Sequence, residues 1–201
     1  MKLSNLPAQT GPYIVKVKNG AKWQDFRTAR LQVSVGGPRH EGDKFRATIE
    51  WIRHRFDKSI FCVNDTLQRF NYMNNGISEN EAYDLSLQAG NEWLSRHAEE
   101  IYSLPNAEIY RWEDWKGPNF IRQHKAVLDL YSHNQRFRDA IADGVKNKLS
   151  KNYLLEEVAV FSCMYQTHDA VDIYPGTLPK AMDIFKDQHT TRIDFSKRRA
   201  A

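Results

Sequence analysis

The sequence has few cysteines, no long apolar run and only a small charge imbalance, and each shortage excludes a class of protein. Two cysteines, Cys62 and Cys163, among 201 residues give neither a disulfide framework nor the spacing of a metal site. No apolar stretch approaches the roughly 20 residues that span a bilayer. The first residues lack the apolar core of a signal peptide. We therefore expect a cytoplasmic protein without a metal ion or a membrane partner.

The charge of the chain is nearly balanced, with a formal net charge of +4 and a pI near 9.0. Such an excess permits nucleic acid as a partner but does not require it. Much of the excess comes from Lys197, Arg198 and Arg199 near the end of the chain. We expect a flexible, solvated basic tail over residues 190–201.

Glycine motifs that bind phosphate are absent as well. Neither G-x-G-x-x-G nor G-x-x-x-x-G-K-[ST] follows the first buried strand predicted below. The turn at that place, Val35-Gly36-Gly37-Pro38, is short, and Pro38 removes a backbone amide donor. Binding of ATP or NAD is not expected, and the sequence predicts no cofactor.

Short apolar runs alternate with amphipathic segments along the chain. The runs predict strands at residues 12–18, 31–35, 59–63, 107–112 and 170–174. The amphipathic segments predict helices at residues 42–56, from 78 towards 101, 118–131, 134–148, 150–165 and 179–186. A capping box at Ser78 opens the second helix. This alternation indicates an α/β fold, a single Rossmann-like domain over residues 1–201 with a mostly parallel sheet flanked by helices.

Ser34 lies at the end of the strand predicted at residues 31–35, just before Gly36-Gly37-Pro38. In open α/β sheets, ligands bind in the crevice at the carboxyl ends of the strands, where this hydroxyl can face them. The alternative is a serine that satisfies only the backbone of its own turn. His40 is near enough in sequence to suggest a hydrolase, but no G-x-S-x-G elbow surrounds the serine.

Tyr153 and Glu157 are four residues apart on a predicted helix and therefore share one of its faces. A carboxylate beside a phenol can receive a substrate ammonium group through charge-assisted hydrogen bonds. The alternative is a surface glutamate and a half-buried tyrosine. The neighbouring Glu156 is expected to point to solvent. Tyr174 and Pro175 end the fourth buried strand, again at a carboxyl edge.

Together these features resemble the cyclodipeptide synthases, which make a cyclic dipeptide from two aminoacyl-tRNAs. The resemblance covers residues 28–185, and its main marks are Ser34, the Tyr153-Leu154-x-x-Glu157 motif and Tyr174-Pro175. It implies a monomeric Rossmann-like domain similar to the catalytic domains of class I tyrosyl- and tryptophanyl-tRNA synthetases. It also implies an aminoacyltransferase that uses its two aminoacyl-tRNAs sequentially and needs no ATP.

Several positions depart from the family's pattern. Thr28 replaces its usual histidine, Gln32 its usual glycine and Ala159 its frequent proline. The helix after residue 82 has few of the basic residues that many members use to hold tRNA, with only Arg96 and His97 near the expected patch.

The resemblance also implies roles for individual residues. Ser34 would carry first an aminoacyl and then a dipeptidyl ester, while Tyr153 and Glu157 hold the ammonium group. Tyr174 would relay a proton or orient the dipeptide as it cyclises. Gly37 would hold X, the variable position in the name of the X-Tyr-Pro subgroup, and a Tyr-Pro pair would supply the other two. The resemblance therefore places the chain in that subgroup.

The pocket for the first aminoacyl group would include polar side chains. By the same resemblance, its residues are Arg30, Gln32, Trp112, Val160 and Asp172, and Gly37, Asp65 and Pro175 are further substrate contacts. A polar wall rejects apolar ligands, because its buried groups would remain unpaired. At least one incorporated amino acid is therefore expected to be polar, with histidine and glutamate as trials. Alternatively, Arg30 and Asp172 pair with each other or face solvent.

Two other functions stay open. A non-catalytic tRNA-binding module could use Lys197, Arg198 and Arg199 for phosphate contacts. A serine-dependent hydrolase or acyltransferase would act on small esters without tRNA and would require His40 or another histidine.

Overall fold

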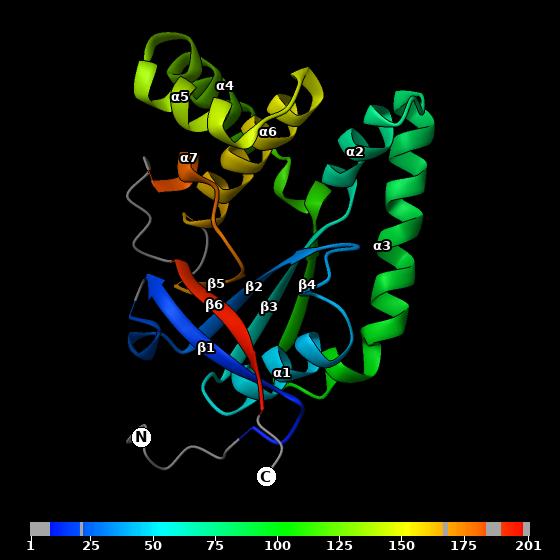
Figure 1. Ribbon diagram of the computed structural model, residues 1–201, viewed down its shortest axis with the longest axis vertical. Helices are drawn as coiled ribbons and strands as arrows, with labels where there is room; N and C mark the ends of the chain where they lie inside the picture. The colour runs from blue at the N-terminus through cyan, green and yellow to red at the C-terminus, as the bar shows by residue number, and fades with distance from the viewer. Residues whose placement is uncertain (1–8, 21, 167–168, 184–189, 199–201) are drawn as a thin grey trace.

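A sheet of six strands forms the centre of the computed structural model, which describes residues 9–20, 22–166, 169–183 and 190–198 (Figure 1). In chain order the strands of these residues are β1 Tyr13–Gly20, β2 Thr28–Ser34, β3 Lys58–Asn64, β4 Ala107–Arg111, β5 Val171–Pro175 and β6 Thr190–Lys197. Their order in the sheet is β1-β6-β5-β2-β3-β4, and β1 alone runs antiparallel to its neighbour. The predicted α/β fold with a mostly parallel sheet is confirmed.

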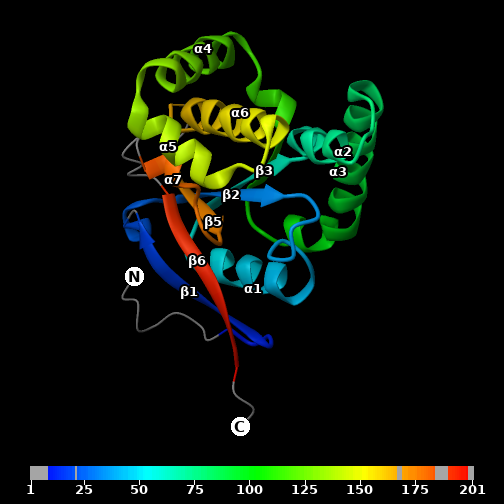
Figure 2. The ribbon, with the colours of Figure 1, turned by 45° about the horizontal axis from the view of Figure 1, so that its top comes forward.

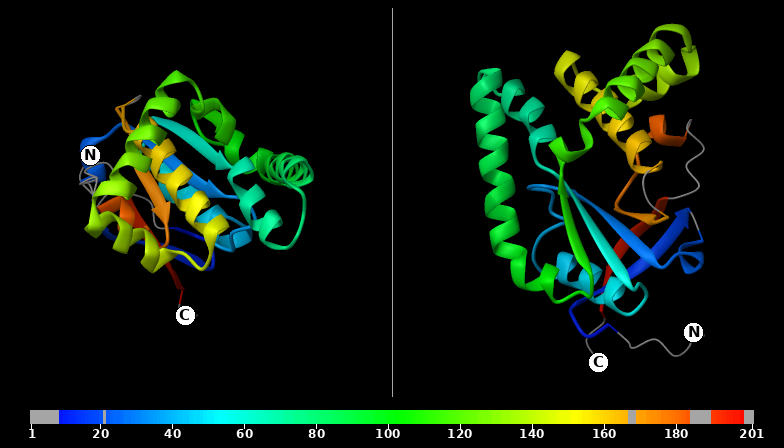
Figure 3. Two further views of the ribbon diagram at one scale, coloured as in Figure 1. Left: turned by 90° about the horizontal axis from the view of Figure 1, so that it is seen from above. Right: turned by 180° about the vertical axis from the view of Figure 1, so that it is seen from behind.

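Helices cover both faces of this sheet (Figures 2 and 3). They are α1 Gly42–Arg53, α2 Arg69–Asn74, α3 Glu79–Tyr102, α4 Pro118–His133, α5 Gln135–Gly144, α6 Lys148–Met164 and α7 Lys180–Asp183, with 3-10 turns η2 Trp23–Asp25, η3 Thr66–Gln68 and η4 Trp112–Trp115. On one face, Phe45 of α1 and Trp93 of α3 share a core with the sheet. On the other face, Val160 and Met164 of α6 pack against Ile60 and Cys62 of β3.

Side chains of β2 alternate between these two faces, as the pleat requires. Leu31 and Val33 belong to the core beneath α1 and α3. Arg30, on the opposite face, donates a 2.6 Å hydrogen bond to the carbonyl of Met164 at the end of α6. Ser34 lies four residues after Arg30 on β2 and therefore on the same face of the sheet. Its hydroxyl thus points towards α6.

The end of the chain differs from its prediction. Residues 190–197 were expected in a flexible basic tail, but Thr190–Lys197 form β6, paired with both β1 and β5. Ile193 is fully buried there, so apolar burial outweighs the exposed charges at the end of the strand. Arg199 of the predicted tail and residues 184–186 of the predicted last helix lie outside the described residues.

Two further details also differ. Ser78 begins α3, but its side chain makes no capping hydrogen bond, so the predicted capping box is wrong while the helix start is confirmed. The short helix α2 between β3 and α3 was not predicted.

Candidate active site

The direction of the sheet order reverses at β2, which lies between β3 and β5. From β2 the chain continues to β3 and β4 on one side and then returns through α4–α6 to β5 on the other. The crevice at the carboxyl ends of β2 and β5 is therefore the switch point at which open α/β sheets bind ligands. Ser34 ends β2 at this point, and Tyr174 and Pro175 end β5 beside it.

Gln68 connects the Ser34 hydroxyl to Tyr153. Its side-chain nitrogen Nε2 lies 3.3 Å from Ser34 Oγ and 3.4 Å from the Tyr153 hydroxyl. Its Oε1 accepts a 2.7 Å hydrogen bond from Asn71, which fixes the orientation of the amide. Sequence reasoning missed Gln68, although its place just after β3, the strand paired with β2, was a usable signal.

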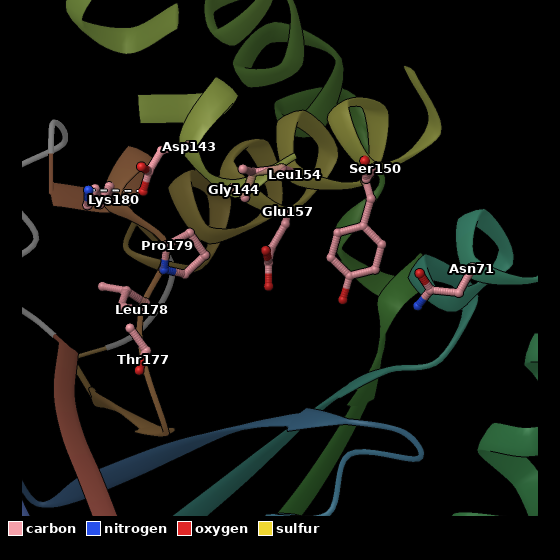
Figure 4. A pocket seen from close by; sticks show the side chains of 11 residues that line it. Asn71, Asp143, Gly144, Ser150, Leu154, Glu157, Thr177, Leu178, Pro179 and Lys180 are labelled. Carbon is pink, nitrogen blue, oxygen red and sulfur yellow. Dashed lines mark ion pairs between the residues drawn. The ribbon is translucent and has the colours of Figure 1, made fainter. Parts of the chain in front are cut away.

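Tyr153 and Glu157 lie on one face of α6, as predicted, and both line a cavity of about 380 Å³ (Figure 4). Glu157 is 4% exposed, which rules out the alternative of a surface glutamate. Burial raises the pKa of Glu157 to about 7. No described residue forms a hydrogen bond or ion pair with its carboxylate, which Figure 4 shows pointing away from α6. A buried carboxyl without a cation is well suited to receive one.

Tyr174 is close to the same pair. Burial raises the pKa of its phenol well above the ordinary value, the nearby Glu157 and Tyr153 raise it further, and Arg39 opposes them. Tyr174 lines a second cavity, of about 190 Å³, together with Ser34. The predicted catalytic residues are thus brought together, and the structure leaves their chemical roles as predictions. The residues that complete the second cavity are Gly37, Pro38, Arg39, His40, Pro175 and Thr177, the last of which also lines the first cavity.

Gly37 closes a tight turn after β2. Its amide donates a 2.9 Å hydrogen bond to the Ser34 carbonyl. A Cβ atom at Gly37 would lie 2.9 Å from the same oxygen and 3.0 Å from His40 Cδ2. The absence of a side chain therefore allows the backbone to fold closely around the serine.

Arg30, Gln32 and Asp172 form one buried polar cluster. Arg30 donates two hydrogen bonds, of 2.7 and 2.6 Å, to the Asp172 carboxylate, and Gln32 Nε2 donates one of 2.6 Å. The alternative of an Arg30–Asp172 pair is the arrangement found, and both side chains are inaccessible to solvent. Gln32 Oε1 has no hydrogen-bond partner among the described residues, although it is buried.

Trp112 and Val160 are fully buried beside this cluster, in the core between α6 and β3. Trp112 Nε1 donates a 2.8 Å hydrogen bond to Glu156, which also accepts from Arg69 and Lys116. Burial would raise the pKa of Glu156, but Arg69 and Lys116 outweigh it and lower the pKa. The prediction that Glu156 points to solvent is wrong, because these donors compensate its burial.

Asp65 lies apart from the two cavities. It is fully buried, and its carboxylate accepts hydrogen bonds from the Thr66 amide and from Arg111 Nε, at 2.8 and 2.5 Å. A Cβ atom added to Gly90 of α3 would lie 2.6 Å from the Cβ atom of Asp65, so the two elements are in close contact here. A carboxylate with these partners anchors η3 against α3, and the substrate contact expected of Asp65 stays a prediction.

His40 does not form a pair with the serine. Burial lowers its pKa to about 4, with Arg39 adding to the effect and Glu41 opposing it. Ser34 Oγ instead has Gln68 and Tyr153 as hydrogen-bond partners among the described residues. Among the described residues no group of three or more histidine, cysteine or acidic side chains could hold a metal ion, and no helix could cross a membrane.

Comparisons with known proteins agree with this geometry. No family model and no curated protein matches the sequence. A solved cyclodipeptide synthase from Fluoribacter dumoffii is 26% identical, with a TM-score of 0.83 over 93% of this chain and 100% of its own. One from Candidatus Glomeribacter gigasporarum, bound to Phe-tRNAPhe, is 18% identical with a TM-score of 0.73, covering 87% and 89% of the two chains.

A third solved structure relates this fold to another enzyme class. The Mycobacterium tuberculosis protein is 12% identical, with a TM-score of 0.73 over 98% of this chain and 99% of its own, and it demonstrates that cyclodipeptide synthases are related to type I tRNA synthetases. The fold is thus the Rossmann-like fold of that class. The solved structures to which the chain is similar are, more particularly, cyclodipeptide synthases.

Proposed function

We propose that this protein is a tRNA-dependent cyclodipeptide synthase in which Ser34 carries the growing dipeptide. The observation that carries the proposal is the convergence of Ser34, Tyr153 and the unpaired carboxyl of Glu157 at the switch point of the sheet. The likeness to solved synthases supports it independently.

The first step exchanges one ester for another. Ser34 Oγ attacks the aminoacyl carbonyl, an ester to Ser34 forms, the bond to the tRNA ribose breaks, and the ribose oxygen takes the serine proton. An ester is already activated, so neither ATP nor a strong Ser-His pair is required. Gln68 holds the hydroxyl, while Glu157 and Tyr153 hold the amino group of the bound residue as an ammonium ion.

The second step forms a peptide bond. After losing a proton, the amine of the seryl ester attacks the carbonyl of a second aminoacyl-tRNA, and the ribose ester breaks to leave a dipeptidyl ester. The new terminal amine then attacks that ester, which closes the ring and restores the Ser34 hydroxyl. Tyr174, which lines the same cavity as Ser34, relays the proton or orients the dipeptide.

At least one of the two amino acids is polar in this proposal. Arg30 and Asp172 form an ion pair with each other. In this proposal the unpaired Gln32 Oε1, between β2 and α6, recognises the side chain of the substrate amino acid. Because an amide oxygen only accepts, it favours a donor such as histidine over the carboxylate of glutamate. Exclusive incorporation of Leu, Phe or Met would contradict this part. The X-Tyr-Pro subgroup, a monomeric state and a cytoplasmic location complete the proposal.

Mass spectrometry of cells that express the chain tests the function. Cyclic dipeptides are expected with the natural protein and absent with Ser34→Ala, while Ser132→Ala on the exposed side of α4 leaves them unchanged. With purified protein and labelled aminoacyl-tRNA, label should be trapped as an ester on the protein only when Ser34 is present. Ester formation without Ser34, or no diketopiperazine from any charged tRNA, would reject the mechanism.

The same experiment separates the alternatives. A tRNA-binding module binds tRNA equally well with Ser34→Ala and forms no ester. A hydrolase turns over small esters without tRNA. No histidine of the described residues forms a hydrogen bond with Ser34, which speaks against this alternative.

A further inference from the structure

Charge is strongly segregated between two helical regions of the molecule. Residues 116–151, from the end of η4 to the first turn of α6, contain eight lysines and arginines against three aspartates. The helix α3 contains six acidic residues and a single arginine, Arg96. The two regions therefore have formal charges of about +5 and −5, which the net charge of the whole chain conceals. They lie on opposite sides of the carboxyl ends of the strands (Figures 1 and 3).

Ion pairing deepens the contrast. Near α3, Arg96 pairs with Glu41 at 3.0 Å and Arg46 with Asp43 at 2.7 Å. In the basic region, five exposed cations form no ion pair with any described residue: Arg122, Lys125, Arg136, Lys146 and Lys148. Uncompensated cations on one surface create a positive field that attracts a polyanion.

Two of the unpaired cations belong to a segment that borders the larger cavity. Asp143, Gly144 and Ser150 line that cavity, and Lys146 and Lys148 lie between them in sequence. The Asn147 side chain ties this segment to α2 by a 3.0 Å hydrogen bond to Asn74. A phosphate backbone held here would lie near the cavity that an aminoacyl end must reach.

We propose that the acceptor arm of tRNA docks on the basic face defined by Lys125, Arg136, Lys146 and Lys148, with α3 directed away from the RNA. This proposal rests on the proposed function for its choice of partner. Double-helical RNA presents phosphates and 2′-hydroxyl groups rather than readable base edges, so lysines and arginines suffice for docking. The acidic α3 would repel the same backbone.

Binding of uncharged total tRNA to the full chain, followed from about 50 to 200 mM salt, tests the surface. The double variant Lys146→Glu/Lys148→Glu should bind at least tenfold more weakly at 100 mM salt, with a salt slope smaller by about two units. Lys16→Glu/Lys18→Glu on β1 is the matched control, since both lysines are exposed, have the same spacing and change the net charge equally. Arg96→Ala should change binding less than twofold.

Equal losses in the two double variants, a large loss with Arg96→Ala, or no tRNA binding by the natural protein would overturn the proposal. These readouts do not depend on catalysis. A selective loss in Lys146→Glu/Lys148→Glu from a protein that makes no cyclic dipeptide supports the docking surface and rejects the synthase. Dipeptide synthesis without that selective loss supports the synthase and rejects the surface.

Discussion

Arg30 and Asp172 are 142 residues apart in the sequence and form a fully buried, doubly hydrogen-bonded ion pair between β2 and β5. The pair joins the two strands whose carboxyl ends carry Ser34 and Tyr174. Its geometry therefore fixes the spacing of the proposed nucleophile and the proposed proton relay.

Removing one partner of this pair should destabilise the fold strongly. Arg30→Met leaves the Asp172 carboxylate buried without its cation, at a cost of about 3–5 kcal/mol. Arg30→Met/Asp172→Leu should recover much of that loss, because it leaves no uncompensated charge. Urea unfolding measures both variants. A double variant no more stable than the single one would contradict this account.

The pKa of Glu157 predicts a pH-dependent stability. Burial raises it from 4.5 to about 7, so the native state holds this proton more tightly than the unfolded state does. The contribution of Glu157 to stability is therefore greatest below pH 4.5 and falls as the pH rises to 7, by about 3 kcal/mol in all. At pH 8 the Glu157→Gln protein should have a free energy of unfolding about 3 kcal/mol higher than that of the natural protein. At pH 4 we expect no such gain.

Unfolding midpoints at the two pH values give the comparison. Glu92→Gln on the exposed side of α3 serves as the control and should show no pH-dependent gain. The Glu157→Gln protein should also lose synthesis of cyclic dipeptides, because a neutral amide cannot pair with an ammonium group. Equal stability changes at pH 4 and pH 8 would exclude a protonated Glu157.

Gln68→Glu should slow acylation of Ser34 by roughly tenfold or more without unfolding the protein, because it replaces the amide donor with an acceptor and misorients the hydroxyl. Rapid-quench trapping of the seryl ester measures the rate. Gln88→Glu, the same change on the exposed side of α3, is the control. An unchanged rate would show that Gln68 does not position the nucleophile.

Gly37→Ala should lower the yield of cyclic dipeptide strongly and the melting temperature only slightly. The added methyl group would press on the Ser34 carbonyl at 2.9 Å and move the turn that holds the serine. Gly11→Ala provides the comparison, since nothing lies within 4 Å of a Cβ atom there. Product yields and melting temperatures of both variants give the answer, and full activity of Gly37→Ala would contradict a tight turn.

The sequence by itself determined the alternation of β1–β5 with the longer helices and the face-sharing of Tyr153 and Glu157. Both depend on local periodicity, which a linear pattern records directly. It also placed Ser34 and Tyr174 at strand ends, from which a parallel sheet brings them to one edge. It misjudged Thr190–Lys197 and Glu156, because their burial depends on partners distant in the sequence.

Only the tertiary structure decided which polar groups are satisfied. Arg30 and Asp172 neutralise each other, and Asp65 is occupied by Arg111, whereas Glu157 and Gln32 Oε1 have no partner among the described residues. No local pattern encodes that distinction, since pairing requires the side chains of separate elements to meet within hydrogen-bonding distance. Of these two unpaired groups, Glu157 lines a cavity and is therefore the one open to a substrate.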